Sequence, residues 1–351
     1  MLAKFTPIVA AILVVAVATV THGQVDDRYR PKIHFSIAAN WINDPNGMVY
    51  MDGEYHLHYQ YNPADSVWGP MHWGIPDFRD PKVIQYDDKW ILLLAAGNKV
   101  MFYSSTDLKT WEYTSEFATQ YFVGGFDGVN FNSPQMTPLW MDWGVDNYAA
   151  ISFFNEPSGR AVNMGWMNNW DYANGLPTIG WRGQMTLPRV MDLVLVNGQL
   201  RLASNPAPEL RTLFKNETYQ TVPNQVVEAD QVLEIPTGNS SLLHTEFTFD
   251  TRTMGIGGFV DFAPNFSRRI TATRERSSTE AIKFEIYWDV TAVEVFIDGG
   301  LTCMTALFYP DEPYTILEVR HHGAGNPGGT LVISSGSIRS LYAMDELINK
   351  K

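Results

Sequence analysis

A carboxylate in an asparagine-rich turn is the first candidate for chemistry. Asp44 lies between two asparagines in the segment 41–47, next to Asn43. Pro45 fixes its own φ and Gly47 permits a tight reversal, so the loop can hold an acid in place while its neighbours donate hydrogen bonds to it. The same residues also fit an Asx-Pro turn in which Asp44 has no chemical role. Spacing alone leaves both interpretations open.

Four uncommon motifs follow one another near the start of the chain, at residues 41–47, 59–63, 68–74 and 78–82. In this order they resemble the catalytic domain of glycoside hydrolase family 32, the invertases, inulinases and levanases that act on β-fructosides. Later segments are similar to further parts of that domain, at residues 120–128, 140–144, 165–172 and 181–189. Aromatic residues in these segments could stack on sugar rings or pack between propeller blades.

The resemblance implies a role for each matching residue. Hydrolysis with retention needs an attacking carboxylate and a protonated carboxyl group about 5–5.5 Å apart. Asp44 would be the nucleophile, and Asp80 would stabilise the transition state by accepting hydrogen bonds from fructose hydroxyls. Without the resemblance, Asp80 would more simply be a turn residue paired with Arg79. The residues that would line the fructosyl pocket are Asn43, Gln60, Trp68 and Arg79.

The general acid that the resemblance requires is absent from the sequence. In the family it is a glutamate followed by cysteine, whereas this chain has no Glu-Cys pair and its only cysteine is Cys303. At Phe117-Ala118 the chain passes directly from the segment that precedes this motif to the segment that follows it. A second join lies at Gly74-Ile75, where a stretch that contacts substrate in the family is also missing. Residues 131–134 do not replace the acid motif, because they follow residues 126–128.

Chain length agrees with two missing segments. Residues 24–190 leave about 33 residues for each of five blades, against the roughly 40–45 that a four-stranded blade takes. Such a propeller would not close, and its open blade edges would invite aggregation. Either the protein is truly shortened or the sequence lacks some coding segments. The surviving motifs keep nearly every residue of the family pattern, which favours the second cause.

Short strands must position these residues. Runs of aromatic and branched residues between turn signals predict strands at 33–38, 54–61, 90–96 and 100–104, and residues 104–111 predict the turn at a blade edge. Further strands at 284–288, 293–297 and 304–308 are typical of a β-sandwich. Residues 289–296 resemble the family's C-terminal module, so Glu294 is predicted to be a strand residue and not a catalytic acid. The only predicted helix lies near residues 341–349.

The predicted architecture is all-β, with an incomplete five-bladed β-propeller followed by a β-sandwich. The propeller covers residues 24–190, a transition covers 191–224, and the sandwich covers 225–351. Residues 1–23 contain Lys4, an apolar run and small residues at the end, which is typical of a signal peptide; the alternative is an uncleaved anchor. Three glycosylation sequons fit secretion, at Asn216, Asn239 and Asn265.

Composition narrows the choice of partners. The formal net charge of −13 argues against nucleic acid or an anionic membrane and is compatible with a neutral sugar. A single cysteine, Cys303, excludes an intrachain disulfide and is predicted to be a buried thiol. No cofactor or metal is predicted, because no cluster has ligand spacing: His56 and His58 alternate on a strand, and His321-His322 lie in a turn.

The leading hypothesis is a secreted, extracellular β-fructofuranosidase-like glycoside hydrolase that acts on terminal β-fructosides of sucrose, inulin or levan. It uses a retaining double displacement, impaired here because the acid/base segment is missing. Its partner is a fructosyl-containing saccharide, with no nucleic acid and no membrane after the leader is removed. The alternatives are a catalytically inactive, secreted fructan-binding or interaction protein, and a product that does not fold.

Overall fold

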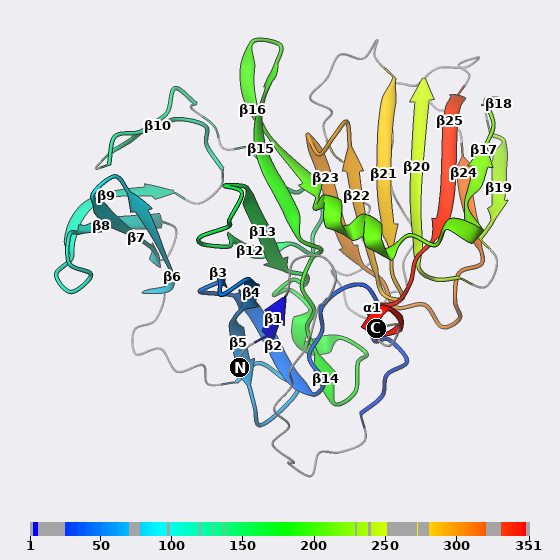
Figure 1. The fold of residues 1–351 in the computed structure, drawn as a ribbon. Helices are drawn as coiled ribbons and strands as arrows, with labels where there is room; N and C mark the ends of the chain where they lie inside the picture. The colour runs from blue at the N-terminus through cyan, green and yellow to red at the C-terminus, as the bar shows by residue number, and fades with distance from the viewer. Residues whose placement is uncertain are drawn as a thin grey trace.

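The computed structural model describes most of the chain as β-structure in two parts (Figure 1). The described residues are 3–5, 25–69, 78–96, 99–118, 121–128, 130–135, 137, 139–228, 230–237, 240–250, 272, 281–320 and 331–348. Side chains are left out at 3–5, 78–80, 95–96, 99–100, 113–118, 250 and 320. Several small sheets form the N-terminal part, and one large sheet dominates the C-terminal part.

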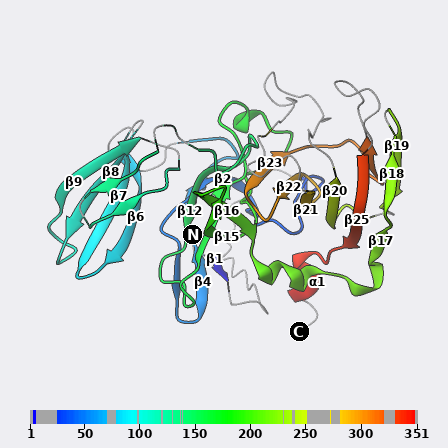
Figure 2. The same cartoon turned by 90° about the horizontal axis from the view of Figure 1, so that it is seen from above.

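An antiparallel four-stranded meander, the usual unit of a propeller blade, forms a lobe at one side of the molecule. Its strands are β6 (Phe78–Tyr86), β7 (Lys89–Ala96), β8 (Lys99–Ser105) and β9 (Glu112–Ala118). The predicted blade-edge turn joins β8 to β9, and Asp107 Oδ1 there accepts the backbone N–H groups of Lys109 and Thr110 at 2.8 Å each. Figures 1 and 2 both place β6 toward the rest of the domain and β9 farthest from it.

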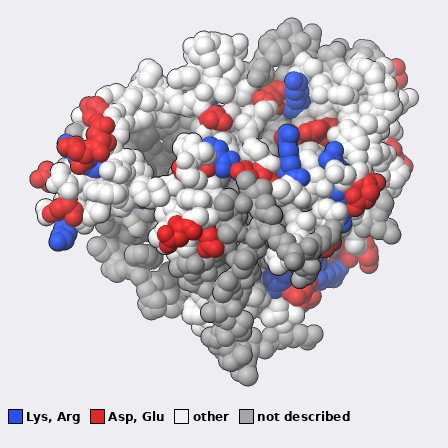
Figure 3. Space-filling model, in the orientation of Figure 1, with Lys and Arg blue, Asp and Glu red and all other residues white. Residues whose placement is uncertain are grey.

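Exposed acidic side chains lie on this lobe, as Figure 3 shows. They include Asp87 and Asp88 in the β6–β7 turn, Asp107 in the β8–β9 turn and Glu112 at the start of β9. A surface of this sign repels polyanions.

The central sheets surround the predicted nucleophile. A second four-stranded sheet has the order β12 (Tyr148–Ser152), β13 (Ala161–Trp166), β15 (Arg189–Val196), β16 (Gln199–Pro206). Next to it, β2 (Asn40–Pro45) lies between β5 (Tyr59–Asn62) and β14 (Trp181–Arg182). Smaller sheets are formed by β1 (Ala3–Phe5), β4 (Glu54–Leu57) and β3 (Val49–Met51), and by β10 (Gly125–Phe126) and β11 (Phe131–Asn132). Only two of these N-terminal sheets have four strands in the described part of the chain, as an incomplete propeller would.

The C-terminal part is the predicted β-sandwich. Its large sheet has the order β17 (Gln220–Val222), β25 (Leu331–Ser340), β20 (Leu243–Asp250), β21 (Ile282–Trp288), β22 (Ala292–Ile297), β23 (Thr302–Leu307), and β18 (Gln225–Val227) also pairs with β25. The pair of β19 (Val232–Pro236) and β24 (Ile316–Arg320) packs on it through Ile235 and Val319. Both strands therefore contribute to one apolar core.

Three 3-10 helices and one short α-helix complete the described elements. The 3-10 helices are η1 (Ala173–Gly175), η2 (Pro208–Leu213) and η3 (Asn216–Thr218). The α-helix α1 (Met344–Ile348) confirms the predicted C-terminal helix at a shorter length. No helix in the described part of the chain has the length and apolar character to cross a membrane.

Most strand predictions are confirmed, by β4 and β5, β7, β8, β21, β22 and β23. The strand predicted at 33–38 is wrong: that segment forms only a single bridge, Ser36 to Gln184. Its first backbone N–H groups, those of Ile33 and His34, donate to the carboxylate of Asp289 at 2.9 and 3.0 Å and so are not available to a neighbouring strand. Local sequence could not reveal an acceptor so far along the chain.

Other predicted features lie partly outside the described residues. Of the predicted leader only 3–5 are described, as β1 against β4, and its removal stays a prediction. Asn239, Asn265 and His321-His322 lie outside the described residues, whereas Asn216 is exposed at the start of η3. The predicted boundary at residue 190 falls inside β15, whose hairpin with β16 runs on to Pro206.

An apolar face is exposed on the β15–β16 hairpin, which projects beyond the neighbouring strands in Figure 1. Leu193 pairs with Leu202 and Leu195 with Leu200, so all four leucines share one face. Leu193, Leu195 and Leu200 are exposed, Leu195 to 71%. Contiguous apolar surface of this kind promotes association.

We expect the double variant Leu195→Lys, Leu200→Lys to self-associate less than the parent chain, because two charges would interrupt the leucine face. Light scattering after size-exclusion chromatography measures the change. Ile179→Lys is the matched control, since Ile179 is exposed to a similar degree outside the hairpin. Equal association of the parent and both variants would contradict this role of the hairpin.

Candidate active site

The predicted nucleophile lies in the middle of a sheet. Asp44 is 1% exposed on β2, and the pairing with β5 shifts register between Ile42 and Pro45. Bulges of this type re-aim side chains and occur often beside active sites. After the strand, Gly47 adopts a φ of 62°, which makes the predicted tight reversal. The sequence motif therefore folds as a strand that bulges at the acid and turns directly after it.

Two of the predicted pocket residues are joined to each other beside Asp44. The Asn43 side chain accepts a hydrogen bond from Trp41 Nε1 at 2.9 Å and donates from Nδ2 to Gln60 Oε1 at 2.5 Å. Asn43 is buried and Gln60 half-buried. Both ends of the Asn43 amide thus bond to protein atoms, which makes Asn43 a residue that positions Gln60 next to the bulge.

An aromatic cluster extends from β2 to the surface. Trp166 packs 4.7 Å from Trp170 and 5.8 Å from Trp41 between ring centroids, while Tyr148 meets Trp166 and Trp170 edge-on. Trp41 and Trp166 are fully buried, whereas Tyr148 is exposed. The sequence left open whether the aromatic residues pack between blades or stack on sugar rings. In this cluster the inner rings pack in the core, and the outer rings are exposed and available to a ligand.

Trp68 stands at the outer end of this aromatic cluster. Its ring lies edge-on to Trp170 at 6.3 Å, and it is 53% exposed. The backbone N–H of Trp68 donates to Asn174 Oδ1 at 3.0 Å, which fastens the loop after β5 to η1. A large, fixed and exposed ring of this kind suits a sugar face.

Arg79 and Asp80 lie on β6, and their side chains are outside the described residues. The pairing of β6 with β7 shifts register between Arg79 and Lys82, so the backbone at Asp80 bulges as it does at Asp44. Lys82 Nζ donates to the carbonyl oxygen of Ser152 at the end of β12, and burial lowers the pKa of Lys82 to about 8. This contact joins the lobe to the sheet beside β2.

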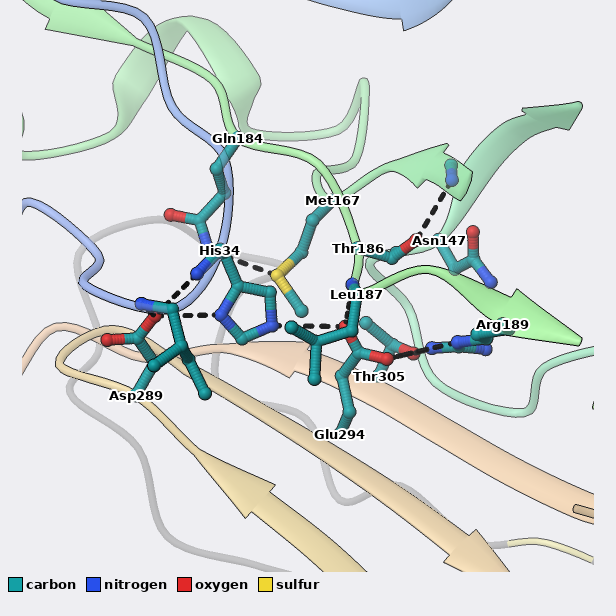
Figure 4. Close-up of polar contacts among 12 residues, drawn as sticks. His34, Asn147, Met167, Gln184, Thr186, Leu187, Arg189, Asp289, Glu294 and Thr305 are labelled. Atoms are coloured by element: carbon teal, nitrogen blue, oxygen red, sulfur yellow. Dashed lines mark hydrogen bonds and ion pairs between the residues drawn. The ribbon is translucent and has the colours of Figure 1, made fainter. Parts of the chain in front are cut away.

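Glu294 is part of a buried ion cluster between the two parts of the chain, shown in Figure 4. Its Oε1 atom accepts the backbone N–H of Leu187 at 2.7 Å and lies 3.0 Å from His34 Nε2. Its Oε2 atom pairs with Arg189 Nη2 at 2.7 Å. The prediction that Glu294 is a structural strand residue is confirmed, since Glu294 lies in β22 and its side chain joins the sandwich to the N-terminal part.

The other acids of the ion cluster are Asp289 and Asp142. Asp289 lies 2.8 Å from His34 Nδ1 and accepts three consecutive backbone N–H groups, from Lys32 to His34. Asp142 pairs with Arg189 at 2.8 Å. Sequence reasoning missed these partners. The signal that could have revealed them is that two acids lie in an apolar region: Asp289 directly follows β21, and Glu294 lies within β22.

Electrostatics explain how so many charges tolerate burial. Burial alone would raise the pKa values of Asp289 and Glu294, but their cationic neighbours and hydrogen bonds keep both pKa values below the usual range. Burial lowers the pKa of His34, yet its hydrogen bonds to the two carboxylates raise that pKa to about 9. His34 is therefore a cation at neutral pH.

Cys303 and one group of potential ligands need no active-site role. Cys303 is a buried thiol, as predicted, and burial raises its pKa to about 12. Among the described residues, the ligand atoms of His244, Glu246 and Glu285 lie within 4.8 Å of one another, a cluster that the sequence spacing had not revealed. His244 Nε2 already forms a hydrogen bond of 3.0 Å with Glu285 Oε1, which joins β20 and β21.

Family models match both parts of the chain. The model of the glycosyl hydrolases family 32 N-terminal domain matches in three pieces, residues 34–76, 74–120 and 113–206. The model of the family 32 C terminal matches residues 210–339. The two breaks in the first match fall at the predicted joins, Gly74-Ile75 and Phe117-Ala118. The gap between the two models lies after β16, where the hairpin ends.

Individual relatives agree with these matches. The chain is 28% identical to a levanase of Bacillus subtilis over 84% of the chain and 68% of that protein. It is 23% identical to an extracellular exo-inulinase of Aspergillus awamori over 92% of the chain and 97% of that protein, in an alignment of 525 residues. Because this chain has 351 residues, that relative carries internal sequence that the chain lacks.

Solved structures share the fold. The crystal structure of the exo-inulinase from Aspergillus awamori superposes with a TM-score of 0.78 at 20% identity, covering 92% of this chain and 100% of that one. A fructofuranosidase from Schwanniomyces occidentalis complexed with fructosylnystose superposes with a TM-score of 0.76 at 19% identity, covering the same shares. A propeller followed by a sandwich is therefore the architecture of this chain.

His34 makes stability depend on pH. Its pKa rises from 6.5 unfolded to about 9 folded, so its contribution is complete below pH 6.5 and is lost as pH rises to 9. We expect a loss of up to about 3 kcal/mol of unfolding free energy over this window, since one pKa unit is about 1.4 kcal/mol. Denaturant unfolding at pH 6 and pH 9 measures it.

The comparison with His34→Gln isolates this effect, because glutamine does not titrate. Lys82, with its pKa lowered to about 8, acts in the opposite direction over the upper part of the window and is present in both proteins. If the parent and His34→Gln lose the same stability between pH 6 and pH 9, the protonated state of His34 is refuted.

Proposed function

The chain belongs to glycoside hydrolase family 32, and we propose on this basis that it is a secreted β-fructosidase-type enzyme with an incomplete catalytic site. Its substrate class is the terminal β-fructoside of sucrose, inulin or levan. Similarity to levanases, exo-inulinases and a fructofuranosidase over most of the chain supports this class. The N-terminal family model matches the chain in three separate pieces, which supports an incomplete catalytic site.

Asp44 is the proposed nucleophile. One carboxylate oxygen forms a bond to the anomeric carbon while the glycosidic C–O bond breaks, and water later hydrolyses the fructosyl-enzyme with overall retention. Burial at a strand bulge, beside an amide pair formed by Asn43 and Gln60, supports this role because it holds the acid in one orientation. Asp80 is proposed to stabilise the transition state, and Arg79 to line the pocket with Trp68.

The departing oxygen needs a proton, and no residue of the expected type supplies one. The sequence has no Glu-Cys pair, and the family-model match breaks where that motif belongs. Loss of a general acid costs typically about 10²–10⁴-fold in rate. Sequencing the full-length transcript across the two joins distinguishes a true shortening from missing coding segments, because only the second leaves extra in-frame codons there.

We expect the 351-residue chain to release fructose from sucrose, inulin and levan at least about 10²-fold more slowly than a complete exo-inulinase assayed in parallel. The measurement is fructose release under single-turnover conditions, with Asp44→Asn as the control that removes the nucleophile. Hydrolysis by the parent chain at the rate of the complete enzyme would show that its acid comes from elsewhere.

Binding without turnover is the second candidate function, favoured by the intact aromatic cluster and the Asn43–Gln60 bond. We expect Trp68→Ala to weaken binding of short β-fructosides about tenfold, a loss of about 1.4 kcal/mol, because its exposed ring can stack on the sugar. Isothermal titration with fructosylated trisaccharide measures it.

The matched control is Trp140→Ala, because Trp140 is exposed to the same degree but packs on Trp143 outside the aromatic cluster. Equal affinity of the parent and Trp68→Ala would remove Trp68 from the site. No detectable binding by the parent would argue against a retained fructosyl pocket altogether.

A further inference from the structure

A cavity of about 140 Å³ lies where the N-terminal segment meets the lower edge of the sandwich. Its lining includes Arg28 and Tyr29 from the N-terminal segment and Leu243 and Trp288, which pair at the ends of β20 and β21. The loop between β23 and β24 completes it and runs below these strands in Figure 1. None of the residues assigned to the fructosyl site lines this cavity.

Aromatic side chains form much of the lining, from Tyr29, Trp288, Phe308 and Tyr314. Tyr314 stacks on Phe308 with ring centroids 5.6 Å apart and ring planes 29° apart, so Phe308 packs against one face of the Tyr314 ring. Its side of the cavity is open, because Tyr314 is 47% exposed. A ring that is held on one face and free to solvent on part of its surface is a platform for another flat or puckered ring.

Polar groups lie at the same cavity. Thr237 Oγ1 is buried and has no hydrogen-bond partner, although the backbone N–H of Thr237 is tied to the Thr315 carbonyl at 2.9 Å, next to Tyr314. At the rim, Arg28 Nη2 donates to the backbone carbonyl of Asp311 at 2.5 Å and lies 3.6 Å from its carboxylate. Buried hydroxyl groups are rarely left unpaired without a reason.

The combination selects a class of ligand. A saccharide presents C–H faces that pack on aromatic rings and hydroxyl groups that bond to threonine, serine and charged side chains. A polyanion is disfavoured, because Asp289 and Asp311 line the cavity and the chain has a net charge of −13. A purely apolar ligand would leave the Thr237 hydroxyl unpaired.

We propose that this cavity is a second saccharide-binding site, which holds a distant part of the same β-fructan chain whose end enters the fructosyl pocket. The choice of fructan rests on the proposed function. Two sites on one protein bind a polymer with higher effective affinity than either alone, whereas a short saccharide reaches only one. The cavity therefore matters for inulin and levan and not for sucrose.

The test compares Tyr314→Ala, Trp68→Ala and the double variant with the parent chain. The proteins are produced without N-glycans, because the sequon at Asn239 immediately precedes Ser240 in the cavity lining. Affinity electrophoresis in levan and titration with a fructosylated trisaccharide are the two readouts. We expect Tyr314→Ala to weaken levan binding about tenfold, to leave trisaccharide binding unchanged, and to abolish levan binding when combined with Trp68→Ala.

Tyr219→Ala is the matched control, because Tyr219 is exposed to a similar degree at η3 and does not line the cavity. Thr237→Val provides a second, nearly isosteric variant, which removes only the unpaired hydroxyl and should also weaken levan binding. Thermal unfolding of each variant excludes a general loss of fold.

The outcomes separate the two proposals. If levan binding is lost in Trp68→Ala but is unchanged in Tyr314→Ala and Thr237→Val, the fructosyl pocket stands and the second site is refuted. If the parent binds neither levan nor the trisaccharide, the proposed function and the second site both fail. Weakened levan binding in Tyr314→Ala with intact trisaccharide binding supports both.

Discussion

The buried pair of Arg189 and Glu294 is the interaction on which the rest of the structure depends. Removing one partner of a buried ion pair leaves an unpaired charge and typically costs about 3–5 kcal/mol. Here the cost would reach further, because Arg189 begins β15 and Glu294 lies in the middle of strand β22 of the sandwich sheet. His34 and Asp289 extend the cluster to the segment before β2. The position of β2, and with it Asp44, is thus fixed by contacts with the other domain.

This dependence explains which parts of the architecture survive the missing segments. The ion cluster and the interface cores, which combine Leu187 with Phe296 and Tyr172 with Leu307, hold β13, β15 and the sandwich together. In the sequence, the two joins flank the β6–β9 lobe: Gly74-Ile75 precedes β6, and Phe117-Ala118 ends β9. In the described part of the chain, that lobe contacts the segment that contains β12 through Lys82 to Ser152 and through the ring contact of Trp90 with Phe154. It also contacts β10, where Tyr86 donates a hydrogen bond to the carbonyl oxygen of Phe126. The sheets around Asp44 therefore need the sandwich more than they need the lobe.

Sequence patterns predicted what depends on local chemistry. Strands were found where aromatic and branched residues alternate, and Gly47 makes the reversal that its motif predicted. The error at 33–38 and the unrecognised role of His34 have one cause: Asp289, more than two hundred residues away, takes the backbone N–H groups that a strand would use. The Asn43–Gln60 bond was equally hidden, because pairing of β2 with β5 decides it. The resemblance identified the candidate site residues, but the sequence pattern could not show that the Asn43 amide donates to the Gln60 amide.

Recognition and hydrolysis place different demands on such a fold. Recognition of a saccharide needs a fixed surface against which the sugar can pack. The aromatic cluster that ends at Trp68 supplies such a wall, because Trp68 contacts Trp170 and Trp170 packs on the buried Trp166. Hydrolysis needs two carboxyl groups held about 5–5.5 Å apart, one charged and one protonated. Under the proposed function Asp44 is the first, and the chain has no Glu-Cys pair to supply the second. Under the proposed function, the shortened chain lacks the proton donor and keeps the aromatic wall. The proposed function therefore separates the two demands: this chain retains a feature that saccharide binding requires and lacks one that bond cleavage requires.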